Sequence, residues 1–72
     1  MKTGEVIKQI LKEKGIKMSW LAEQLKLSSS TLYNRLDEDL KVNFILEICK
    51  VINISLDDVF KKYDEMLKEK EK

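Results

Sequence analysis

The sequence predicts an all-α fold, a compact domain of five helices, and three observations support this. The chain has no proline and only two glycines, both within its first fifteen residues. It is rich in Leu, Ile, Lys and Glu, which favour helices. Apolar residues recur at helical spacing along most of the 72 residues. This length allows a single domain, 1–67, followed by a charged tail, 68–72, that we expect to fray.

The first two helices are short and closely spaced. We place the first at residues 4–14, with Thr3 as its N-cap and Gly15 as a glycine that ends it in a left-handed conformation. The second covers residues 18–25, and only two residues separate it from the next helix-start signal. A tight turn therefore joins the second helix to the third.

The third helix, residues 28–36, has an unusual exposed face. Ser28 is a good N-cap, and Leu32 and Leu36 point inward at a spacing of four residues. The opposite face is uncharged but rich in hydrogen-bonding groups, where most surface helices carry Lys and Glu. Its members are Ser29, Ser30, Tyr33 and Asn34.

The last two helices complete the predicted core. Residues 43–52 are apolar around much of the helix and should lie at the centre of the domain. Residues 55–67 begin at Ser55, and Asp58 three residues later forms a capping-box pattern. We therefore expect a central fourth helix and a fifth helix with a secure start.

The composition excludes several classes of function. The chain has no His and a single Cys, so it lacks a histidine base, the usual nitrogen ligands of a metal and an intramolecular disulfide. It has no apolar stretch long enough for a membrane helix or a signal peptide. We expect a cytoplasmic protein that is not an enzyme, binds no cofactor or metal, has no membrane partner and shows no small-molecule effector site.

Two short helices joined by a tight turn have the geometry of a helix-turn-helix. Nine helical residues form a rod of roughly 13 Å, which suits a DNA major groove about 12 Å wide. The hydroxyl and amide groups on the third helix can bond base edges, and Asn can bond adenine with two hydrogen bonds. Double-stranded DNA is therefore the partner that this pattern favours.

The motifs resemble those of the phage-repressor and Cro-like (XRE) family. The similarity lies in residues 15–32 and 48–60, and its motifs are a Leu-Ala pair in the second helix, Ser-x-Ser-Thr-Leu at the start of the third and Ile-Ser-Leu-Asp-Asp before the fifth. The resemblance implies a five-helix repressor-like domain that binds an operator sequence, usually as a homodimer, and is typical of phages and other mobile elements. It leaves repression and activation both open.

These arguments give a set of candidate site residues. The residues expected to contact DNA are Lys17, Met18, Ser19, Ser28, Ser29, Ser30, Thr31, Tyr33, Asn34 and Arg35. The residues expected at a dimer interface are Tyr63, Met66 and Leu67, which alternatively only cover the core. Arg35 either contacts phosphate or pairs with an acid of residues 37–39, and Trp20 either covers the core or contacts the DNA backbone.

Several positions depart from the family pattern. Lys26 occupies the turn where the family commonly has Gly, and Met18 stands where it often has Gln. Residues 37–39 are all acidic, so they would repel phosphate unless they are turned away. The near-neutral net charge, Met18 and the acidic residues 37–39 favour an alternative, a helix-turn-helix-derived protein-interaction module of anti-repressor or antitoxin type that does not bind DNA.

Overall fold

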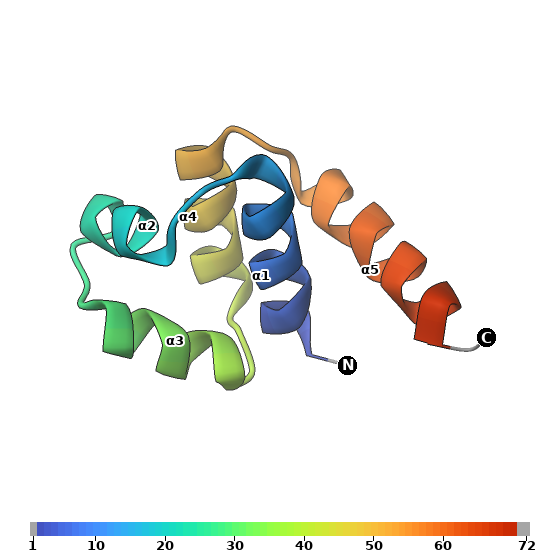
Figure 1. Ribbon diagram of the computed structural model, residues 1–72, viewed down its shortest axis with the longest axis horizontal. Helices are drawn as coiled ribbons and strands as arrows, with labels where there is room; N and C mark the ends of the chain where they lie inside the picture. Colours follow the sequence, from blue (N-terminus) through green and yellow to red (C-terminus); the bar gives the residue numbers. More distant parts are fainter. Residues whose placement is uncertain (1, 71–72) are drawn as a thin grey trace.

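A computed structural model describes residues 2–70, and this part of the chain contains five helices and no strand. The helices are α1 (Thr3–Lys14), α2 (Met18–Gln24), α3 (Ser29–Asp37), α4 (Val42–Ile52) and α5 (Leu56–Lys70). Helix α1 packs against both α3 and α5, α2 packs against α3 and α4, and α4 packs against α5 (Figure 1). The predicted all-α fold is confirmed.

The core is built from apolar side chains of all five helices. They are Val6, Ile7, Ile10, Leu11, Leu21, Ala22, Leu32, Leu36, Ile45, Ile48, Cys49, Ile52 and Val59. No polar or charged side chain of the described residues is buried. The buried core therefore gains its stability from the removal of apolar surface from water.

The helix starts follow local hydrogen-bonding signals. The Ser28 hydroxyl accepts a hydrogen bond from the Thr31 N–H at 3.1 Å, so Ser28 is the N-cap of α3 as predicted. At α5 the Ser55 N–H donates to the Asp58 carboxylate at 2.9 Å, and the Asp58 N–H donates to the Ser55 hydroxyl at 3.2 Å. This reciprocal pair confirms the capping box. Thr3 is not the N-cap of α1, because it is already helical and Lys2 precedes the helix without a capping side chain.

The ends of α2, α4 and α5 differ from prediction by a few residues. Helix α2 ends at Gln24, and α4 begins at Val42. Helix α5 continues to Lys70, beyond the predicted end at residue 67, because Lys and Glu are good helix formers. Lys70 also lies 3.7 Å from the Glu5 carboxylate of α1, which adds a contact at this end. Residues 71–72 of the predicted frayed tail lie outside the described residues.

Helices α1 and α3 approach each other closely at Gly4. A Cβ atom at this position would lie 1.7 Å from the Leu36 carbonyl oxygen. Only glycine fits there, so Gly4 sets the distance between α1 and the C-terminal part of α3. Within residues 2–70, no helix combines the length and the hydrophobicity of a membrane-spanning segment.

Candidate nucleic-acid interface

The turn between α2 and α3 closes through a left-handed residue. Lys26 has a φ of 60°, its N–H donates to the Glu23 carbonyl at 3.1 Å, and the next N–H, of Leu27, donates to the Ala22 carbonyl at 2.9 Å. These two bonds form the closing motif in which glycine is usual. The helix-turn-helix is therefore intact without the glycine that the family commonly has there, and the Lys26 side chain makes its backbone conformation less favourable.

The outward face of α3 is centred on Ser30 and Asn34. At about 100° per residue, these two side chains point away from the buried Leu32 and Leu36. Both are exposed, and neither has a hydrogen-bond partner among the described residues. Their hydrogen-bonding groups are therefore available to a ligand.

The residues at the start of α3 have a mainly structural arrangement. Ser29 and Thr31 are half-buried, while Ser28 is exposed. The Ser28 and Thr31 hydroxyls lie 2.8 Å apart and hydrogen-bond to each other, in addition to the capping bond. Among the residues predicted to contact DNA between positions 28 and 34, Ser30, Tyr33 and Asn34 are therefore the most accessible.

Tyr33 lies at the edge of α3 that faces α1. It is 45% exposed, and the Lys8 ammonium lies 5.6 Å from the centre of its ring, which is a cation–π distance. The same ammonium pairs with the Asp37 carboxylate at 2.9 Å, and Lys2 donates to the Asp37 carbonyl oxygen at 2.6 Å. Two lysines of the N-terminal segment therefore bind Asp37 at the C-terminal end of α3, Lys8 at its carboxylate and Lys2 at its carbonyl oxygen.

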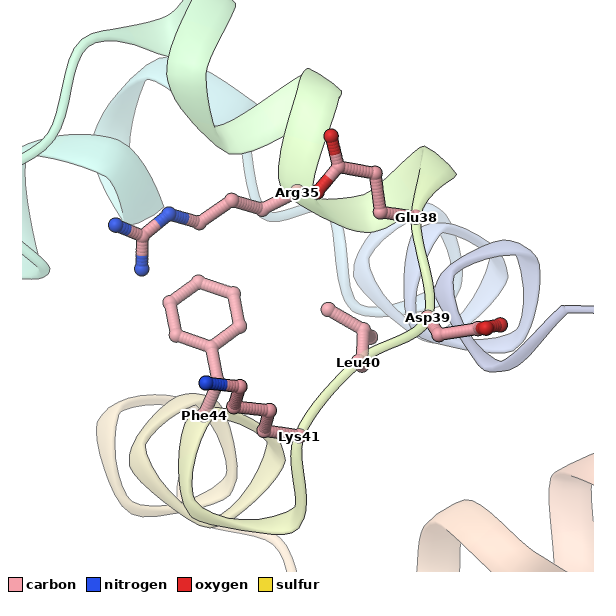
Figure 2. A pocket seen from close by; sticks show the side chains of 6 residues that line it. All are labelled: Arg35, Glu38, Asp39, Leu40, Lys41 and Phe44. Carbon is pink, nitrogen blue, oxygen red and sulfur yellow. The ribbon is translucent and has the colours of Figure 1, made fainter.

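Arg35 lies at the opposite edge of α3, next to α4. Its guanidinium carbon is 5.2 Å from the centre of the Phe44 ring, and Figure 2 shows the guanidinium above that ring. No acid of the described residues lies within 4.0 Å of it. Together with Glu38, Asp39, Leu40 and Lys41, the two residues line an open pocket of about 270 Å³. The alternative interpretation, in which Arg35 pairs with an acid of residues 37–39, is not what the structure shows.

At the start of α2 the predicted contacts separate into two groups. Lys17 and Ser19 are exposed, and Lys17 precedes the helix without a capping bond from its side chain. Met18 is half-buried and packs against the core. Trp20, for which a lid on the core and a contact to the DNA backbone were both open, exposes 43% of its surface.

The residues predicted for a dimer interface lie partly on the core of the same chain. Tyr63 and Met66 are half-buried and pack against it, which agrees with the alternative interpretation that they cover the core. Leu67 is also half-buried. The more exposed apolar side chains are elsewhere, at Phe60 (58%) on α5 and Val42 (60%) on α4.

The one cysteine has the environment of a structural residue. Cys49 is buried, and its desolvation, followed by the nearby charge of Asp58, raises the pKa of its thiol. A thiol with a raised pKa is a poor nucleophile at neutral pH. Cys49 therefore contributes to the core.

Sequence reasoning missed the roles of Lys8 and Phe44 at the interface. Lys8 contacts residues of α3 that lie 25 and 29 positions later, and Phe44 lies nine positions after Arg35. No local pattern in the sequence pairs residues so far apart. The sequence shows only that Lys8 lies on the first helix and that Phe44 lies on an apolar helix.

Comparison with known proteins identifies the family of this domain. The family model described as the Cro/C1-type HTH DNA-binding domain matches residues 6–65. Searches of curated proteins and of solved structures gave no match. The matched range includes α2, α3 and the turn between them, as well as most of α1 and α5. The chain therefore belongs to the Cro/C1-type helix-turn-helix DNA-binding domain family.

Proposed function

We propose that this protein is a sequence-specific, repressor-type transcriptional regulator that places α3 in the major groove of double-stranded DNA. The observation that carries the proposal is the exposed pair Ser30 and Asn34, whose hydrogen-bonding groups have no partner among the described residues. An amide and a hydroxyl on one helix face suit base edges, because Asn can bond adenine with two hydrogen bonds and Ser can bond several bases.

The residues around this pair divide into two roles. Ser30 and Asn34 bond base edges, and Tyr33 contacts a phosphate or a thymine methyl group at the edge of the groove. Lys17 and Ser19, at the start of α2, contact the phosphate backbone and set the register of α3. Met18 is turned toward the core and supports α2 from within.

We infer that the protein acts as a homodimer on a pseudo-palindromic operator in the cytoplasm. Two copies of a helix-turn-helix read two half-sites about one helical turn apart, or 34–36 Å. Occupancy of such a site would block RNA polymerase. Leu67 and the exposed Phe60 of α5 are the apolar groups on α5 that such an interface would use.

The first experiment is selection of bound duplexes from a random DNA pool at moderate salt. Enrichment of two half-sites spaced by about one helical turn is expected, and it would establish base reading together with dimer binding. A single half-site would support base reading and contradict the homodimer. Folded protein that enriches no sequence would contradict the proposed function.

Asn34→Ala combined with Ser30→Ala tests which residues read the bases. Loss of these contacts should weaken binding to the selected site by about 1–3 kcal/mol for each good base contact, with little change on unrelated DNA. Gln9→Ala is the matched control, because the Gln9 amide bonds Glu13 within α1. An equal loss on selected and unrelated DNA would show that these residues only support the fold or the phosphate contacts.

A second candidate is a protein-interaction module that does not bind DNA. It is favoured by the exposed apolar side chains Trp20, Val42 and Leu46, of which the last two lie one turn apart on α4. In that case the Ser30 and Asn34 substitutions would alter the binding of a protein partner, and the DNA selection would fail. The two candidates are thus separated by the same pair of experiments.

A further inference from the structure

The contact between Arg35 and Phe44 joins the end of α3 to the start of α4. We propose that Phe44 is a positioning residue, which holds the Arg35 guanidinium ready for a DNA phosphate and keeps it out of the adjacent acidic turn. This inference rests on the proposed function, since it assigns a phosphate contact to the edge of the same interface. It also explains how the acidic residues 37–39 can follow a DNA-reading helix.

No other described residue forms a hydrogen bond with the guanidinium donors of Arg35. Arg35 is exposed, and its guanidinium carbon lies 5.2 Å from the centre of the Phe44 ring (Figure 2). A guanidinium that rests on an aromatic face keeps the N–H groups at its rim available, and these match a phosphate with two parallel hydrogen bonds. Phe44 is itself half-buried and packs against the core, so the position of its ring is fixed.

None of the acidic residues 37–39 forms an ion pair with this guanidinium. Asp37 pairs with Lys8 at 2.9 Å, on the side of α3 that faces α1. Glu38 and Asp39 line the same open pocket as Arg35, yet neither lies within 4.0 Å of its guanidinium nitrogens. Figure 2 shows the Asp39 carboxylate directed away from Arg35. Arg35 therefore packs on the Phe44 ring and does not form the alternative ion pair with an acid of residues 37–39.

Lys41 places a second cation at the same pocket. It lines the pocket with Arg35 and Phe44, and it directly precedes α4, whose N-terminal end favours negative charge. A phosphate at this edge would meet Arg35 and Lys41 together, on the side of α3 opposite Lys8 and Tyr33.

A double-mutant cycle on affinity for the selected duplex tests the inference. Arg35→Ala should weaken binding about tenfold per bound chain and reduce the slope of log affinity against log salt by about 0.9. Phe44→Leu keeps an apolar side chain and the Arg35 charge, so binding should weaken about two- to fivefold, as expected for loss of an exposed cation–π contact. In the Arg35→Ala background, Phe44→Leu should have no further effect.

Further variants and controls separate positioning from folding. Phe44→Tyr keeps the aromatic ring and should retain an affinity close to that of the wild type. Thermal unfolding followed by circular dichroism should show that each variant is folded. Equal effects of Phe44→Leu in both backgrounds, or an unchanged salt slope in Arg35→Ala, would overturn the inference and leave the proposed function intact. Wild-type protein that binds no DNA would overturn both.

Discussion

Lys26 and Asn53 are the two non-glycine residues with a positive φ in the described part of the chain, at 60° and 59°. Each follows a helix and lets the next N–H reach back to a carbonyl, from Leu27 to Ala22 and from Ile54 to Cys49. Asparagine tolerates this conformation better than lysine does. The helix-turn-helix therefore includes local backbone strain at Lys26 that the end of α4 largely avoids.

Lys26→Gly should stabilise the protein by about 0.5–1 kcal/mol, because relief of the strain exceeds the added flexibility of glycine in the unfolded chain. The free energy of unfolding in urea measures this effect. Asn53→Gly is the matched control and should change the stability less. A loss of stability in Lys26→Gly would show that the lysine side chain supports the turn by a contact of its own.

The Asp58 carboxyl contributes to the pH dependence of the free energy of unfolding. Hydrogen bonds from the backbone and the hydroxyl of Ser55 lower the pKa of the Asp58 carboxyl. A carboxyl with a lower pKa in the folded state than in the unfolded state stabilises the fold above its usual pKa. This contribution is lost as the pH falls through the range below about 4.

Asp58→Asn should therefore lose less stability than the wild type between pH 6 and pH 2. The amide oxygen can still accept the Ser55 N–H bond, so the comparison isolates the charge. The measurement is the free energy of unfolding at a series of pH values. Asp57→Asn, which removes the neighbouring carboxylate and leaves the capping box, should keep the pH dependence of the wild type; a flattened profile in this control would assign the effect to the helix end in general.

At the scale of elements, the placement of α3 depends on its contact with α1. Leu32 and Leu36 bury the inner face of α3, and Gly4 of α1 lies directly against the Leu36 backbone. Lys8 of the same helix reaches Tyr33 and Asp37. Helix α1 thus orients α3 although it belongs to neither part of the helix-turn-helix.

Gly4→Ala should destabilise the protein by about 1–3 kcal/mol, because the added methyl group meets a backbone oxygen that cannot move alone. Chemical denaturation measures the loss. Lys12→Ala on the exposed face of α1 is the matched control and should stay within about 0.5 kcal/mol of the wild type. Gly4→Ala with wild-type stability would mean that α1 and α3 can separate at little cost, and the close approach would not position α3.

For the whole molecule, net charge says little about DNA binding, because it is only +1. The distribution of charge matters more. Lys17, Arg35 and Lys41 are exposed around α3, while Glu38 and Asp39 are exposed beside it. Association with DNA should therefore depend on where a charge lies as well as on the total.

Glu38→Gln combined with Asp39→Asn should raise DNA affinity by about two- to thirtyfold at low salt, as expected for two exposed charges that each contribute about 0.2–1 kcal/mol. Titrations at two salt concentrations measure this, and the gain should shrink at the higher concentration. The matched control, Asp64→Asn with Glu69→Gln, makes the same change in net charge on exposed positions of α5. An equal gain in the control would assign the effect to net charge alone.

The sequence by itself determined where the helices lie and that two of them form a helix-turn-helix. Caps, apolar periodicity and the short gap between α2 and α3 act over a few neighbouring residues, so Ser28, Ser55 and Gly15 could be interpreted directly. The exposure of Ser30 and Asn34 followed from the same periodicity, since they lie opposite Leu32 and Leu36 on α3.

Only the tertiary structure decided which distant residues meet at the edges of α3. The inward turn of Met18, the contact of Tyr63 and Met66 with the core, and the pairing of Arg35 with Phe44 depend on how the helices pack. Each of these side chains has apolar surface that fits either a core or an interface, and local spacing does not distinguish the two. Helix packing does, because it fixes which surface is covered and which charge finds a partner.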